Sequence, residues 1–331
     1  MTLKDTAGKL PRMDFKLLWM RFTKSPAAVA YALSALLFAL TIIINPKGFN
    51  NNFIGSLILL TVLLAISSAG QTIVLIGGGL DFSGGAVMSA AAIFTSFTMD
   101  SKDGLFLQVL VMCLAMGAVV GFLNGFFVVK IGLPAMIVTM AVSNIVSRLQ
   151  YVLTAGSPAG WAGPAFINSV IHRFFDVIPS IVLYAAVFFP IVFWLLQRSR
   201  FGKQVYLVGN NKQAAYLTGV KVNWVIIATY VISGMMSAFA GILGAGYKAT
   251  ARVDIFSEYA FTSLVAVIVG GTTFSGGVGT YGGTIAGALL MTVLSNLLTT
   301  LGLPQTMRDI LNGLIIILLL MMYNRSKAVR Q

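Results

Sequence analysis

The chain has few charged residues, a single cysteine and a single histidine. Only 9% of its 331 residues are charged, whereas a soluble domain carries roughly 25%, so the composition excludes an ordinary soluble protein. Cys113 has no partner for an intramolecular disulfide. His172 has no second histidine with which to share a metal, and it cannot supply a catalytic set alone. The sequence therefore predicts no catalytic residue and no metal site on this chain.

The chain also lacks the loop that binds nucleotide phosphates. No segment reads G-x-x-x-x-G-K-[ST], and Gly202-Lys203-Gln204 has neither the upstream glycine nor the hydroxyl for magnesium. Segment Gly277–Gly282 matches G-x-G-x-x-G, but it lies between two apolar segments, and no acidic residue follows at about 20 positions. We therefore expect no nucleotide and no other cofactor on this chain.

What the chain has in abundance is apolar sequence, since 58% of its residues are hydrophobic. Apolar stretches of about 20 residues predict transmembrane helices. We expect ten, at 27–45, 53–76, 84–99, 105–129, 134–153, 178–196, 223–246, 257–272, 282–300 and 307–323. The predicted fold is thus an all-α polytopic membrane protein, with a basic segment at 1–26, one transmembrane domain at 27–323 and a tail at 324–331.

The distribution of basic residues predicts the topology. Most of the 22 lysines and arginines fall before the first span, after the last, or between residues 197 and 222. The positive-inside rule then places both termini and the 197–222 loop in the cytoplasm. This topology accounts for the net charge of +13. We therefore expect no nucleic-acid partner.

Two copies of one short phrase interrupt the apolar segments, and they suggest an internal repeat. Phe82-Ser83-Gly84-Gly85 follows Gly78-Gly79, and Phe274-Ser275-Gly276-Gly277 follows Gly270-Gly271. Glycine clusters break helices and expose backbone groups that hydrocarbon cannot satisfy. Paired breaks of this kind point to a transporter's translocation pathway. The predicted pathway residues are Gly78, Gly79, Asp81, Ser83, Gly85, Gly270, Gly271, Ser275, Gly276 and Gly277.

Asp81 is the carboxylate nearest the predicted membrane interior, where a charge is costly. Two roles are open: it caps the helix that begins near Ser83, or it bonds to a substrate in transit. The polar residues Gln71, Asn124, Asn144 and Asn296 are likewise candidates for the pathway or for bonds between helices. Glycines four residues apart, at Gly117, Gly121 and Gly125 and at Gly279, Gly283 and Gly287, predict close helix contacts, which we expect to be internal.

The 197–222 loop contains a predicted short helix. Gly209-Asn210-Asn211 offers an N-cap, residues 212–218 can form about two turns, and Gly219 suits the position after the helix. Such a helix has no core of its own, so it packs on its own bundle or docks a soluble partner.

Three segments resemble the signatures of one transporter family. Residues 76–85 (IGGGLDFSGG) resemble its GGIDLSVG signature, residues 209–220 (GNNKQAAYLTGV) its GGNxxAAxxSGI loop, and residues 269–280 (VGGTTFSGGVGT) its VIGGTxxxGGxGT segment. Phe82 and Gly84 stand where that family has Leu and Val. The chain thus resembles the permease subunit of ribose/xylose/galactoside-type ABC importers, within the branched-chain amino acid/sugar permease superfamily.

The resemblance implies a passive transport subunit rather than an enzyme. Two copies, or two related chains, would form the pore in a bacterial inner membrane. A separate ATPase subunit with tandem nucleotide-binding domains would hold ATP and magnesium, and a periplasmic binding protein would deliver a pentose or hexose. The implied ATPase-coupling residues are Gly209, Asn210, Asn211, Lys212, Ala214, Ala215, Thr218 and Gly219. The alternative is an ion-coupled secondary transporter, which usually carries several intramembrane carboxylates.

Overall fold

The structure is a computed structural model that describes residues 25–250, 252–304, 306–308, 310–311 and 313–314. The predicted tail at 324–331, nearly all of the predicted segment at 1–26 and most of the predicted span at 307–323 lie outside these residues.

The described part of the chain is almost entirely helical. Its elements are α2 (Pro26–Ile44), η1 (Pro46–Gly48), α3 (Asn51–Ile76), α4 (Gly84–Met99), η2 (Asp103–Leu105), α5 (Phe106–Phe126), the π-helical η3 (Phe127–Ile131), α6 (Ala135–Thr154), α7 (Pro164–Ile171), β1 (Arg173–Phe174), β2 (Ile178–Pro179), α8 (Ile181–Gln197), α9 (Arg200–Asn210), α10 (Lys212–Leu217), α11 (Val222–Lys248), α12 (Tyr259–Val269) and α13 (Tyr281–Thr300). Strands β1 and β2 form an antiparallel pair.

Polar caps fix where several of these helices begin. The side chains of Ser25, Asn50 and Thr280 each accept a backbone N–H from three residues further on. Such bonds satisfy one of the amides that a helix start leaves unpaired. Helices α2, α3 and α13 therefore begin directly after these residues.

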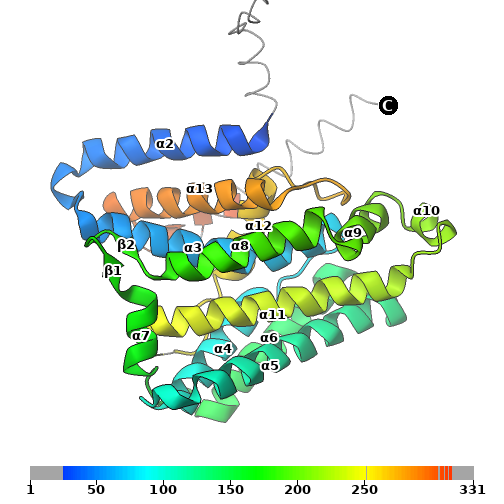
Figure 1. Cartoon of the computed structure of the whole chain (residues 1–331), viewed down its shortest axis with the longest axis horizontal. Helices are drawn as coiled ribbons and strands as arrows, with labels where there is room; N and C mark the ends of the chain where they lie inside the picture. Colours follow the sequence, from blue (N-terminus) through cyan, green and yellow to red (C-terminus); the bar gives the residue numbers. More distant parts are fainter. Residues whose placement is uncertain (1–24, 251, 305, 309, 312, 315–331) are drawn as a thin grey trace, which may run out of the picture.

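The long helices lie side by side in one bundle. Figure 1 shows α2 beside α13 on one face and α5 beside α6 on the opposite face. Helix α11 lies between them and packs against α5, α4 and α3. Helices α9 and α10 lie at one end of the bundle, which we call the α10 end, and α7 with the strand pair lies at the other, the α7 end.

Among the described residues, six helices are long and apolar enough to cross a membrane: α2, α3, the continuous run of η2, α5 and η3, α6, α11 and α13. The pair α8 and α9, which is bent by 58°, raises the number to seven if it forms one span. Helices α4 and α12 occur where spans were predicted, but with 16 and 11 residues they are shorter than the roughly 20 residues a full crossing needs.

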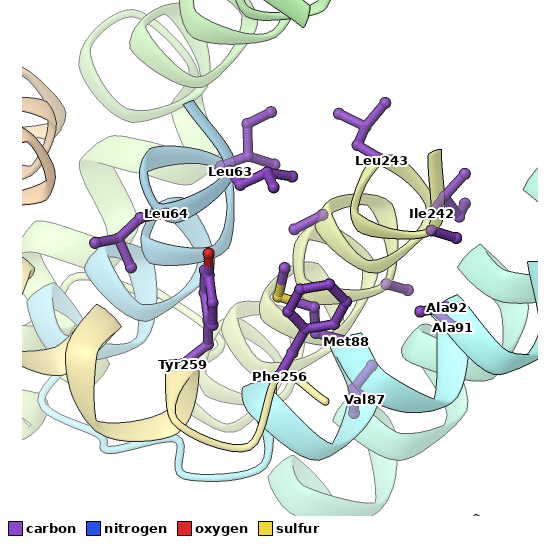
Figure 2. Close-up of a cluster of buried hydrophobic side chains, with 14 of the residues drawn as sticks. Leu63, Leu64, Val87, Met88, Ala91, Ala92, Ile242, Leu243, Phe256 and Tyr259 are labelled. Carbon is purple, nitrogen blue, oxygen red and sulfur yellow. The ribbon is translucent and has the colours of Figure 1, made fainter. Parts of the chain in front are cut away.

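The core of the bundle is built where α3, α4 and α11 meet the segment before α12. Figure 2 shows Met88 of α4 beside the ring of Phe256, and it shows Leu63 of α3, Leu243 of α11 and Tyr259 in the same cluster of buried side chains. These side chains come from four parts of the chain that are far apart in sequence. The two short helices are therefore surrounded by protein along much of their length, which removes the cost of ending a helix in hydrocarbon.

Both predicted glycine stripes are internal seams. A Cβ at Gly117 or Gly121 would collide with backbone carbonyl oxygens of α11, and one at Gly125 would lie 2.7 Å from the Cα of Ile227. On α13, a Cβ at Gly283 or Gly287 would collide with carbonyl oxygens of α12 and its C-terminal glycine. Backbones approach this closely only where side chains are absent.

Candidate functional site

The two glycine breaks meet each other and the end of α9. The amide of Gly277 donates to the carbonyl oxygen of Ile76 at 2.8 Å. A Cβ at Gly276 would lie 3.0 Å from the Cα of Gly78, and a Cβ at Gly209 would collide with the Ile76 carbonyl oxygen. We call Gly78, Gly209, Gly276 and Gly277 the glycine junction.

A side-chain bond reinforces this junction. The hydroxyl of Tyr206, in α9, donates to the carbonyl oxygen of Gly279 at 2.8 Å. The C-terminal ends of α3 and α9 and the loop after α12 are thus in contact mainly through backbone atoms. A displacement of α9 would be transmitted directly to both breaks, because little flexible side chain lies between them.

The short helix predicted in the 197–222 loop is present as α10. The side chain of Asn211 caps it by accepting the amide of Ala214 at 3.0 Å, and Gly219 follows it with φ of +82°. The sequence did not predict the preceding helix α9, to which Gly209 and Asn210 belong. Helix α9 extends α8 beyond a bend at Arg198-Ser199, where Ser199 caps α9 through the amide of Gly202.

Helix α10 has one face on the bundle and one face exposed. Ala215 is buried, with 2% of its surface exposed, in a cluster with residues of α8, α9 and α11. Tyr216 and Leu217 are 71% and 79% exposed, and the predicted coupling residues Lys212, Ala214 and Thr218 are exposed as well. Packing on its own bundle therefore leaves an apolar and polar surface of α10 available to a partner.

The first break contains a buried carboxylate. Asp81 is 2% exposed, and one of its oxygens accepts from the amide and the hydroxyl of Ser83 at 2.9 and 2.6 Å. Its other oxygen accepts from the hydroxyl of Ser233, on α11, at 2.8 Å. The side-chain amide of Asn124, on α5, donates to the Ser83 hydroxyl at 2.8 Å. Three donors thus compensate the burial of this charge.

Asp81 fulfils part of its first predicted role, because it accepts a backbone N–H freed at the start of α4, that of Ser83, although Ser83 and not Asp81 is the N-cap residue of that helix. The Ser83 amide that it accepts lies just before α4, and the N-cap residue of α4 makes no side-chain cap bond. The carboxylate also ties the first break to α11 and, through Ser83, to α5. Sequence reasoning missed Ser233 and also Tyr230, whose hydroxyl donates to the Leu80 carbonyl oxygen at 3.3 Å; the only signal was their spacing on one face of α11.

Most of the remaining pathway residues lie against neighbouring protein segments. A Cβ at Gly85 would lie 2.8 Å from the carbonyl oxygens of Phe256 and Ser257, so α4 begins against the segment before α12. A Cβ at Gly270 would collide with α13, and one at Gly271 would lie 2.7 Å from Pro26 of α2. At Gly79 it would lie 2.5 Å from the Tyr230 hydroxyl oxygen. Ser275, by contrast, is exposed.

A second polar region lies between α3, α12 and α13. A cavity of about 270 Å³ is lined by Leu60, Leu64, Glu258, Tyr259, Thr262, Met291, Thr292, Ser295, Asn296, Thr299 and Arg308. The lining is rich in hydroxyl groups, and it includes one of the predicted polar residues, Asn296. Its side-chain amide donates to the Thr292 carbonyl oxygen at 3.0 Å, which leaves its own oxygen and one N–H for other partners.

The other predicted polar residues lie in different places. Gln71 and Asn124 are buried, and each has a side-chain atom without a hydrogen-bond partner among the described residues. Asn144 lies on the exposed face of α6 and donates to the Met140 carbonyl oxygen at 3.0 Å. The structure thus joins Asn124 to the Asp81 network and Asn296 to the cavity, and it brings Asn144 to neither.

Comparisons with known proteins agree with this architecture. An apolar helical bundle with interrupted helices and a partly exposed helix at one end fits a multi-pass transport permease. Residues 53–320 match the family described as "Branched-chain amino acid transport system / permease component", and the chain belongs to this family. No solved structure matches the chain.

Individual relatives cover most of the chain. The galactose/methyl galactoside import permease protein MglC of Haemophilus influenzae is 31% identical over 83% of this chain and 85% of its own length. The ribose import permease protein RbsC of Escherichia coli is 28% identical over 92% and 97%. The probable ABC transporter permease protein y4mJ of Sinorhizobium fredii is 30% identical over 81% and 80%. These relatives favour an import permease over an ion-coupled secondary transporter.

Proposed function

We propose that this chain is the membrane-spanning permease subunit of an ATP-driven importer that translocates a monosaccharide. The similarity to ribose and galactose import permeases over most of the chain supports this substrate class. ATP and magnesium would be held by a separate ATPase subunit, since the sequence lacks a phosphate-binding loop. A periplasmic binding protein would deliver the sugar, and a second copy or a related permease would complete the pore in the bacterial inner membrane.

The observation that carries the proposal is the link between α10 and the glycine breaks. Tyr216 and Leu217 project from α10, while Gly209, at the end of the preceding helix, touches Ile76 and Gly277. An ATPase that binds the exposed face of α10 and moves on closure would therefore displace both breaks together. Because packed interfaces switch between discrete arrangements rather than deform continuously, such a movement would open or close the bundle.

In this proposal the α10 end is cytoplasmic, as are both termini. The polar cavity lies toward the α7 end, because it includes Leu60 from the first half of α3, where Gly55 lies against Arg173 and Val177 of the strand pair and its turn. A sugar arriving from the periplasmic side would meet its hydroxyl and amide groups first. A site that must also release its substrate would bind weakly, as in other conduction pathways.

We also infer ten spans and an internal repeat. Helices α4 and α12 are too short to cross alone, but each would complete a crossing together with the non-helical segment next to it. With the bent pair α8–α9 and a span at 307–323, they would add four crossings to the six long helices. The Phe-Ser-Gly-Gly sequence precedes the short helix α4 but follows the short helix α12. Its two copies therefore do not occupy equivalent positions in two repeat units. The better repeat units are α3–α4 and α11–α12, each a long helix followed by a break and a short helix. Gly70 of α3 faces Ser233, and Gly77 faces Thr229, so the two long helices are antiparallel and the repeat would be inverted.

The experiment that tests coupling is purification of the tagged chain from its native membranes in mild detergent. The expected result is a copurified ATPase with measurable ATP hydrolysis. The double variant Tyr216→Glu/Leu217→Glu should lose both the ATPase and sugar uptake while remaining in the membrane. These side chains are a cleaner target than Ala215, because a charged residue at Ala215 would disrupt the chain's own packing.

Phe175→Glu is the control, since Phe175 is highly exposed at the α7 end and should keep the ATPase. Normal ATPase association in the Tyr216→Glu/Leu217→Glu variant would show that α10 is not the docking helix. Uptake that stops when a protonophore collapses the ion gradient, yet continues when ATP is depleted, would instead favour the ion-coupled mechanism.

A further inference from the structure

A groove at the α10 end combines positive charge with aromatic and apolar surface. It has a volume of about 440 Å³ and is lined by Phe122, Phe126, Lys130, Tyr216, Lys221, Val222, Asn223, Trp224 and Ile227. Both lysines are exposed, and none of these lining residues is acidic. The groove therefore presents uncompensated positive charge beside apolar surface.

The lining residues change character in the same direction along both helices. From the bundle interior toward the α10 end, α5 and η3 present Phe122, Phe126 and then Lys130, each four residues apart. Residues so spaced share one helix face. In the same direction α11 presents Ile227, Trp224 and then Lys221 before its first residue, each three residues apart. Two facing stripes thus run toward the α10 end, from aromatic to cationic on α5 and η3 and from apolar through aromatic to cationic on α11.

Exposure of these aromatic side chains supports a membrane-surface role. Trp224 is 65% exposed, and the rings of Phe122 and Phe126 have centroids 6.0 Å apart on the same side of α5. Tryptophan is enriched at the boundary between the hydrocarbon and the headgroups. The π-helical turn η3, a feature often found at functional sites, carries Lys130 to this boundary.

We propose that this groove binds one anionic phospholipid. Its phosphate would lie between Lys130 and Lys221, and an acyl chain would lie along Phe122, Phe126 and Ile227. Basic recesses between transmembrane helices bind anionic headgroups in this way. A free phosphate ion would use only the lysines, whereas a phospholipid uses the whole graded surface. The inference does not rest on the proposed transport function, because it requires only that the chain lies in a membrane.

The site also touches the exposed helix. Tyr216 of α10 lines the same groove, so a bound lipid would contact α10 from the membrane side. Lipid binding would then hold α10 in place whether or not another protein binds Leu217.

The test uses the full-length chain, purified in detergent and studied by native mass spectrometry with added dioleoylphosphatidylglycerol. Dioleoylphosphatidylcholine and inorganic phosphate are the comparison ligands. We expect one phosphatidylglycerol to bind more tightly than phosphatidylcholine. Because a basic residue near the membrane surface contributes about 1 kcal/mol, Lys130→Gln and Lys221→Gln should each weaken binding about fivefold, and the pair about 30-fold.

Lys203→Gln is the matched control, since Lys203 is exposed on α9 but outside the groove, and it should leave the affinity unchanged. Phe122→Ser should weaken phosphatidylglycerol binding but should leave the weak binding of inorganic phosphate unchanged. Equal affinity for the two lipids, or unchanged affinity in the double lysine variant, would overturn the proposal. Displacement of the lipid by millimolar inorganic phosphate would mean a simple anion site and would overturn it too.

Discussion

The carbonyl oxygen of Ile76 accepts a hydrogen bond from the amide of Gly277 at 2.8 Å, which joins the end of α3 to the loop after α12. Gly209 lies against the same carbonyl group, and a Cβ there would also lie 2.6 Å from the Gly277 nitrogen. Backbone atoms of three distant segments thus occupy a space that admits no side chain. The glycines of the junction therefore interrupt helices and also allow the three backbones to pack closely at this point.

The first prediction concerns Gly209→Ala. Alanine is more favourable than glycine in a helix by about 1 kcal/mol. If helix propensity alone mattered, this substitution in α9 would therefore stabilise the protein. At the junction the added methyl group collides with backbone, and we expect a net destabilisation of about 1–3 kcal/mol together with loss of uptake. Thermal unfolding in detergent and sugar uptake by cells measure the two effects. Gly104→Ala is the control, because nothing lies within 4 Å of a Cβ at Gly104; equal stability of both variants would contradict the junction.

The second prediction separates the two uses of Asp81. If its carboxylate holds the break to α11, Asp81→Ala leaves the donors of Ser83 and Ser233 unpaired, at about 1–3 kcal/mol for each buried group. We expect a lower unfolding temperature and a loss of uptake that follows the loss of folded permease. Asp176→Asn, in the exposed turn between β1 and β2, is a control for change of charge. An Asp81→Ala variant of normal stability with a raised KM for one sugar would instead indicate a substrate contact.

Hydropathy predicted the positions of the helices well, but it did not predict which of them are long enough to cross the membrane. Nine of the ten predicted spans coincide with helices of the described residues to within a few positions. Hydropathy does not distinguish a short apolar helix that ends inside protein from one that crosses the membrane. It therefore predicted α4 and α12 as full spans. Helix α9 was missed because Arg200, Lys203 and Gln204 make it polar; its Ser199 cap and its packing on α8 stabilise it instead.

The candidate site was predicted in its residue types but not in its contacts. The glycine breaks and α10 were identified from local sequence, because helix breaking and capping are local effects. The meeting of Gly78, Gly209 and Gly276 depends on how the bundle packs. The partners Ser233 and Asn124 of the Asp81 network come from helices far along the chain, so no local pattern could assign them.

The third prediction concerns access to the two breaks during transport. Ser83 is buried and Ser275 is exposed. In a Cys113→Ala background, a cysteine replacing Ser275 should react readily with a water-soluble maleimide, and one replacing Ser83 should react far more slowly. If ATP opens the bundle at the glycine junction, ATP should speed labelling at position 83. Fast labelling of both positions without ATP would contradict the burial of Ser83.

The fourth prediction tests the polar cavity as a sugar site. Asn296 and Thr262 line it, and each could offer one neutral hydrogen bond to a sugar hydroxyl. Such a bond contributes about 0.5–1.5 kcal/mol, so Asn296→Ala and Thr262→Val should each raise the KM for uptake roughly two- to tenfold, with little change in the amount of folded permease. Asn144→Ala is the matched control, since it removes the same amide from the exposed face of α6 and should leave KM unchanged. An equal KM change in Asn144→Ala and Asn296→Ala would show that the cavity does not contact the sugar.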